Sequence, residues 1–199
     1  MTLERRATAT PPEVRASESA GKVARGYAAL FNTQTDIGGY FREAIAPGAF
    51  AETLTKADVR ALIDHDSGRV IGRSKAGTLR LTEDATGLLA EIDLPDTTDG
   101  RDLAVQLERG DISGMSFGFY VTKEEWDETG DMPVRTILKA ELLEVSAVAF
   151  PAYPDTTLAL RSLEEARKDQ RRKNFSAAAY RLRAKAHLDL RTRKVESKA

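Results

Sequence analysis

The sequence predicts a mainly β fold with a few helices, arranged as a β-barrel or a β-sandwich, with a helical tail at its C-terminal end. Three observations lead to this prediction. In most segments between residues 22 and 150, apolar residues alternate with small or polar ones, which is the pattern of half-buried strands. Clusters of Gly, Asp, Ser and Pro separate these segments, as turns do. Helical spacing is confined, before the tail, to the stretches 47–54 and 98–109.

The composition describes one folded domain with a charged C-terminal segment. Of the 199 residues, 41% are hydrophobic and 31% charged, and no apolar run approaches the ~20 residues of a membrane span. Residues 161–199 contain 13 Lys and Arg against 5 Asp and Glu, a balance of +8, so the rest carries −9. Residues 1–22 are polar and without periodicity, which predicts a mobile arm. We therefore expect a mobile arm over 1–22, a folded domain over 23–160 and a basic helical tail over 161–199.

Short alternating runs bounded by turn residues predict the strands of the first half. The parity of the second of these runs places His65 on one face with Ala61 and Ile63. In order, the expected elements are a strand at 22–31, a loop at 32–39, a short helix near 47–54, a strand at 59–65, a loop at 66–68 and a strand at 69–72.

The second half opens with a hairpin, because two alternating runs flank the turn residues 83–87. A helix follows, since Thr98 or Asp99 can cap its start and Gly110 can end it in the left-handed conformation. In order, the expected elements are strands at 78–82 and 88–94, a helix from about 98 to 109, a strand around Ser116 and a strand-rich segment at 134–150.

The strand around Ser116 contains the first candidate for catalysis. Its large apolar residues fall on one face, whereas Ser116 shares the other face with Gly114 and Gly118. Two glycines beside a hydroxyl leave room for another backbone, such as an extended peptide substrate. The alternative is a crowded or bulged strand with a solvated serine.

A serine hydroxyl needs a base to become a nucleophile, and the chain offers no cysteine and only two histidines, His65 and His187. His187 lies in the charged tail, so His65 is the candidate base. A carboxylate must then fix the imidazole tautomer. Strand parity places Glu144 among apolar residues, where a carboxylate is costly without a partner, and places Glu141 with Lys139. Glu144 is therefore the preferred third member, and Glu141 replaces it if a bulge reverses the parity.

Each of these residues has another interpretation. The run Asp64–Asp66 could bind a metal ion, although hydrolytic metal sites usually use several histidines or carboxylates. His65 could also be a structural or surface histidine, and Glu144 could pair with Arg69 or Arg73. No Gly-rich phosphate loop or nucleotide fingerprint is present, so we expect no cofactor and no metal.

Five blocks of sequence carry a resemblance to a known family. They are Gly26-Tyr27-Ala28-Ala29-Leu30-Phe31-Asn32, Pro47-Gly48-Ala49-Phe50, His65 followed by Val70-Ile71-Gly72-Arg73, Ile112-Ser113-Gly114-Met115-Ser116-Phe117-Gly118-Phe119, and Glu144-Val145-Ser146-Ala147-Val148-Ala149-Phe150-Pro151-Ala152. In this order, over about residues 23–160, they resemble the prohead maturation serine proteases of tailed phages.

The resemblance implies a closed β-barrel like that of the herpesvirus assemblins, with Ser116 as nucleophile and His65 as base. The herpesvirus relatives use a second histidine as third member, so Glu144 remains an inference from this sequence. The resemblance also implies an endopeptidase that cuts the major capsid protein or a scaffold segment, and itself, inside immature phage heads in the host cytoplasm. We expect a homo-oligomer with no membrane partner and no specific nucleic acid.

Two other functions remain open at this stage. The first is a non-catalytic assembly or scaffold module on the same fold, and the second is a metal-dependent hydrolase that uses the run Asp64–Asp66. For the tail we expect a docking role in the assembling head, with self-cleavage near its exposed basic residues 171–174.

Overall fold

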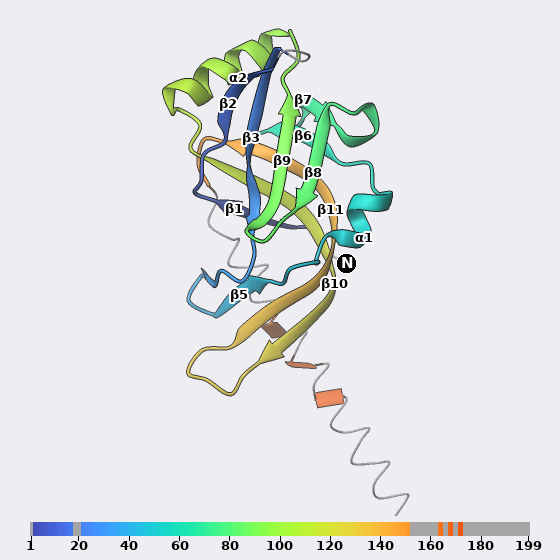
Figure 1. Ribbon diagram of the computed structural model, residues 1–199. Coiled ribbons are helices and arrows are strands. Elements are labelled where there is room, and N and C mark those ends of the chain that lie inside the picture. The colour runs from blue at the N-terminus through green and yellow to red at the C-terminus, as the bar shows by residue number, and fades with distance from the viewer. Residues whose placement is uncertain (1, 18–20, 152–162, 165–166, 169–170, 173–199) are drawn as a thin grey trace, which may run out of the picture. The chain divides into compact units, whose positions relative to one another are not determined.

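The computed structural model describes residues 2–17, 21–151, 163–164, 167–168 and 171–172 (Figure 1). The chain divides into two units, Met1–Ala159 and Leu160–Ala199. The described residues of the second unit are helical. Most of the predicted tail, for which we expect a docking role, lies outside the described residues.

A seven-stranded sheet forms the larger part of the first unit (Figure 1). Its long antiparallel hairpin joins β10 to β11, and β1 pairs with the outer edge of β10. On the other edge, β11 pairs in parallel with β5 near its start and with β6 near its end. The strands are β1 (Glu4–Thr8), β4 (Thr35–Ile37), β5 (Phe41–Ile45), β6 (Arg60–Ile63), β7 (Asp66–Arg73), β10 (Gly114–Asp127) and β11 (Val134–Val148).

A four-stranded antiparallel sheet packs against the first. Its order is β2 (Glu13–Ser17), β3 (Gly21–Leu30), β9 (Gly87–Asp93) and β8 (Leu79–Glu83). The predicted hairpin is confirmed, since β8 and β9 pair from Leu79 opposite Ile92 to Glu83 opposite Leu88. The core between the sheets includes Phe50, Phe117 and Leu88, all fully buried.

The mainly β prediction is confirmed, but the closed barrel is wrong. Ladder pairing ends at β1, β4 and β7 in one sheet and at β2 and β8 in the other. One isolated bridge, Phe31 to Ile45, links the two sheets among the described residues. The chain crosses between sheets at Pro11-Pro12, and proline has no N–H for a ladder. At this crossing the Thr8 hydroxyl, rather than a backbone amide, donates to the Tyr27 carbonyl.

The two predicted helices are present as α1 (Ala51–Lys56) and α2 (Thr98–Arg109). The cap of α2 is Thr97, one residue before the predicted Thr98 or Asp99, because the Thr97 hydroxyl accepts the Gly100 amide. Gly110 ends it with φ of 79°, as expected of a left-handed C-terminal glycine.

The expected mobile arm over 1–22 is wrong for its described residues. Residues Glu4–Thr8 form β1 and Glu13–Ser17 form β2. The β1 strand pairs with β10 in a register that places Ala7 opposite Ser116. The sequence of β1 has no amphipathic pattern, and its partner strand lies more than 100 residues away in the sequence. Local periodicity therefore could not predict this strand.

A buried cluster of charges holds β1 in place. The Arg135 guanidinium donates to both Glu4 oxygens at 2.8 and 2.9 Å and to Glu43 at 2.9 Å, and Arg6 donates to Glu4 and Glu43 at 2.6 Å. Burial raises the pKa of Glu4, but the hydrogen bond and charge of Arg135, together with Arg6, outweigh it and hold that pKa below its ordinary value of 4.5. Burial alone would lower the pKa of Arg135, and its glutamate partners raise it.

Arg135→Met should lower the free energy of unfolding by about 3–5 kcal/mol, because it leaves buried carboxylates with too few cations. Urea unfolding at pH 7 measures this effect. A matched control is Arg80→Met, which breaks the more exposed Arg80–Asp93 pair and should cost less than about 1 kcal/mol.

The same variant should also respond less to acid. The folded-state pKa of Glu4 is lowered, so its stabilisation is present above the unfolded value near 4.5 and is lost as pH falls through the folded value. Arg135→Met removes much of that shift. Equal acid sensitivity in both proteins would contradict the assignment of this stabilisation to the cluster.

Candidate active site

His65 lies in a two-residue turn between β6 and β7 rather than inside a strand. Ile63 pairs with Asp66, and the residues between them, Asp64 and His65, have φ of 48° and 60°. Positive φ at both central residues is typical of two-residue hairpin turns, and Asp and His tolerate it better than most residues. The predicted strand end and the loop at 66–68 are therefore wrong by a few residues, and the turn aims the imidazole independently of strand parity.

Glu144 lies against this imidazole. Its Oε1 is 2.7 Å from His65 Nδ1, and both side chains are largely buried. A carboxylate can only accept, so Nδ1 carries the hydrogen and Nε2 holds the lone pair of a neutral ring. Nε2 is buried without a hydrogen-bond partner among the described residues. The lone pair of His65 Nε2 is therefore available to accept a proton.

A β-bulge sets the face on which Glu144 lies. Leu142 is opposite Phe119 and Glu144 is opposite Gly118, so that Leu143 is the extra residue. Strand parity alone predicts that Leu142, Glu144 and Ser146 share one face. Glu144 and Ser146 do so, whereas the bulge moves Leu142 to the other face with the buried Phe119.

Ser116 is directly opposite Ser146 in the β10–β11 ladder and is almost fully buried. Side chains so paired have Cβ atoms about 4.5–5.5 Å apart. The Ser146 hydroxyl in turn accepts the His65 amide at 3.3 Å, which brings Ser116 to the neighbourhood of the His65 turn. The Ser116 hydroxyl itself donates to the Arg6 carbonyl of β1 at 2.8 Å.

The two glycines beside Ser116 make room for different groups. A Cβ on Gly114 would lie 2.4 Å from the Thr8 carbonyl oxygen, so this glycine does admit another backbone, that of β1. A Cβ on Gly118 would lie 2.6 Å from Glu144 Oε1. Gly118 therefore makes space for the carboxylate that holds His65, a function that the sequence pattern did not reveal.

The residues on which the other interpretations depend have different partners. Asp64 accepts the Ala149 amide and Asp66 accepts the Gly68 amide. Arg69 pairs with Asp99 and Arg73 with Asp58. Within the described residues, no group of three or more His, Asp or Glu side chains is arranged to hold a metal ion.

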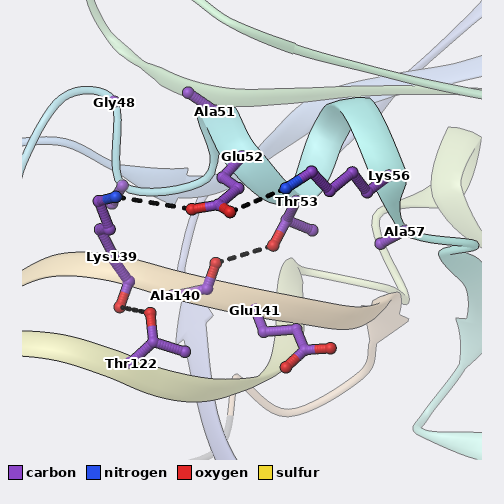
Figure 2. Close-up of a pocket in the computed structure, with 11 residues that line it drawn as sticks. Gly48, Ala51, Glu52, Thr53, Lys56, Ala57, Thr122, Lys139, Ala140 and Glu141 are labelled. Atoms are coloured by element: carbon purple, nitrogen blue, oxygen red, sulfur yellow. Dashed lines mark hydrogen bonds and ion pairs between the residues drawn. The ribbon is translucent and has the colours of Figure 1, made fainter.

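Glu141 lies elsewhere, on the lining of a pocket of about 540 Å³ between α1 and the β10–β11 hairpin (Figure 2). In this pocket Glu52 pairs with Lys56 at 2.9 Å and with Lys139 at 3.5 Å, and Thr53 donates to the Ala140 carbonyl. Figure 2 shows no bond from Glu141 to the other residues drawn. The pocket is separate from the His65–Glu144 pair.

A histidine held by a carboxylate, with its second nitrogen free and a serine nearby, is the arrangement that serine hydrolases use. Residues 10–169 match the protein family described as caudovirus prohead serine protease. The chain belongs to this family.

Two individual proteins are similar to the chain. The prohead protease of Enterobacteria phage HK97 is 31% identical over 140 residues, which cover 67% of this chain and 57% of that protein. The chain thus matches little more than half the length of this relative. The capsid assembly protease of bacteriophage T4 has a similar fold, with a TM-score of 0.53 and 12% identity over 75% of this chain and 98% of that structure. The likeness to herpesvirus assemblins stays a prediction.

No helix in the described part of the chain is long and apolar enough to span a bilayer.

Proposed function

We propose that the chain is a serine endopeptidase of capsid maturation, with Ser116 as nucleophile, His65 as general base and Glu144 as the group that orients it. The observation that carries this proposal is the 2.7 Å contact between His65 Nδ1 and Glu144, which leaves Nε2 buried and unpartnered close to a buried serine. Burying an unsatisfied nitrogen is unfavourable, so such an atom calls for a function. Membership of the prohead serine protease family supports the same roles.

The proposed reaction begins when the Ser116 hydroxyl turns from the Arg6 carbonyl to His65 Nε2. Catalytic hydrogen bonds often form only once substrate is bound. Ser116 Oγ then attacks the scissile carbonyl carbon while Nε2 takes its proton, and Glu144 stabilises the imidazolium that forms. His65 returns the proton to the leaving amine, and water hydrolyses the acyl-enzyme by the same route. Backbone amides would stabilise the oxyanion.

For substrate we propose the major capsid protein or a scaffold segment, cut inside the assembling phage head in the host cytoplasm. The HK97 relative is a prohead protease and the T4 neighbour a capsid assembly protease, which supports this assignment. We further propose that the enzyme acts as a homo-oligomer and cleaves its own basic segment near residues 171–174. The exposed side chains of Arg171 and Arg172 support this proposal.

A fluorophosphonate probe tests the central proposal. Wild-type protein should be labelled covalently, and Ser116→Ala should not. Incubation with the neighbouring capsid protein, followed by mass spectrometry of new termini, then identifies the cleaved bonds. A folded wild-type chain that resists the probe and leaves capsid protein intact would instead indicate a non-catalytic assembly module.

Gly118→Ala should lower the rate of probe labelling by about 10²-fold, because its new Cβ displaces the Glu144 carboxylate and with it the imidazole. Gly130→Ala is the matched control, since its Cβ would meet nothing closer than 3.9 Å. Labelling of Gly118→Ala at the wild-type rate would show that the carboxylate position does not matter.

A further inference from the structure

Ser146 is a fully buried serine that neither the family match nor the sequence pattern assigns to the site. It lies on β11 directly opposite Ser116, two residues after Glu144, which lies opposite Gly118. Its hydroxyl makes two hydrogen bonds: it donates to Glu144 Oε2 at 2.6 Å and accepts the backbone amide of His65 at 3.3 Å. A single hydroxyl thus contacts both members of the proposed His65–Glu144 pair.

The bond to Glu144 restrains the carboxylate. Oε1 is engaged by His65 Nδ1 and Oε2 by Ser146, so the plane of the carboxylate is defined by two partners instead of one. Short O–H···O⁻ bonds of this length are among the stronger hydrogen bonds in proteins. The arginines that the sequence offered for this carboxylate pair with other residues. Among the described residues, Ser146 is therefore the second donor, beside His65 Nδ1, that keeps this buried carboxylate satisfied.

The bond to His65 restrains the turn. Asp64 and His65 both have positive φ, a conformation that persists in non-glycine residues only where the surroundings hold it. The Ala147 carbonyl accepts the Asp64 amide at 3.0 Å, and Ser146 Oγ accepts the next amide, that of His65. Consecutive residues of β11 thus secure consecutive residues of the turn.

We propose that Ser146 is a positioning residue that holds the Glu144 carboxylate and the His65 turn in one geometry beside Ser116. The inference rests on the proposed function, because it assigns Ser146 an effect on chemistry through His65. Loss of the hydroxyl frees the carboxylate to rotate and the turn to shift, so kcat falls while KM for a peptide substrate is retained. A misplacement of about 1 Å costs roughly ten- to hundredfold in kcat.

The test compares Ser146→Ala, Ser146→Thr and Ser146→Val. Thr keeps the hydroxyl, and Val has nearly the same shape without it. Three quantities are measured on the full chain: kcat and KM for a capsid-derived peptide, the thermal unfolding midpoint, and the low-field NMR signal of the proton on His65 Nδ1, with Glu144→Gln as reference. We expect Ala and Val to lower kcat and to shift or broaden the NMR signal without unfolding the protein, and Thr to restore both.

Several results would overturn the inference. Wild-type kcat and an unchanged NMR signal in Ser146→Ala would show that the hydroxyl positions nothing. Equal losses in Thr and Val would assign the effect to packing, and an unfolded Ser146→Ala would assign Ser146 a structural role. A wild-type protein that lacks activity would refute the proposed function instead, and the NMR signal would still report whether Ser146 orders the His65–Glu144 pair.

Discussion

Ser116→Ala and His65→Ala should each reduce peptide cleavage by roughly three to six orders of magnitude, because members of one catalytic unit are individually indispensable. Without Ser116 no acyl-enzyme forms. Without His65 the hydroxyl loses its proposed base, since the Arg6 carbonyl that accepts its hydrogen bond is too weak a base to take the proton. Cleavage of a capsid-derived peptide, followed by mass spectrometry over long incubations, covers the required range of rates.

Two controls accompany this experiment. Ser113→Ala removes an exposed hydroxyl that donates to the Ala149 carbonyl, three residues from Ser116, and should have little effect on cleavage. The double variant Ser116→Ala/His65→Ala should be no slower than the slower single variant, because both changes disable one proton relay. Full activity in Ser116→Ala would end its assignment as nucleophile.

Glu144→Gln should lower kcat by up to ~10⁴-fold, less than the loss of Ser116 or His65. Glutamine keeps the shape of glutamate but replaces one acceptor oxygen by an NH₂ group. Both carboxylate oxygens accept hydrogen bonds, one from His65 Nδ1 and one from the Ser146 hydroxyl. The amide keeps only one acceptor oxygen, so either His65 Nδ1 loses its acceptor or the Ser146 hydroxyl must reverse its role and accept from the NH₂ group. The charge that stabilises the imidazolium is lost in both cases.

Glu141→Gln is the matched control for this prediction. Glu141 lies in the same strand, but it lines the α1 pocket (Figure 2), and His65 Nδ1 contacts Glu144 instead. We expect its effect on kcat to be mild. If Glu141→Gln proves more damaging than Glu144→Gln, Glu141 is the orienting group and the register of β11 in solution differs from the one described.

Much of the fold could be predicted because its signals are local. The hairpin of β8 and β9 follows from alternation around a turn, and α2 follows from a capping threonine and Gly110. The strand of Ser116 and its buried opposite face follow from the spacing of Met115 and Phe117. These features depend on neighbours within a few residues, so their pattern is written in consecutive positions.

The sequence by itself also limited the chemistry. With no cysteine and with His187 in the tail, it left His65 as the candidate base, and the cost of burying a lone carboxylate favoured Glu144. The tertiary structure decided what depends on residues far apart in the chain. It placed β1 on the edge of β10 through a buried ion cluster, left the two sheets unclosed, turned His65 out of its strand, and used the Leu143 bulge to set Glu144 opposite Gly118. The physical reason is that the free energy of the assembled sheet selects pairing partners, bulges and turn conformations. This free energy depends on residues far apart in the chain, so no short stretch of sequence determines it.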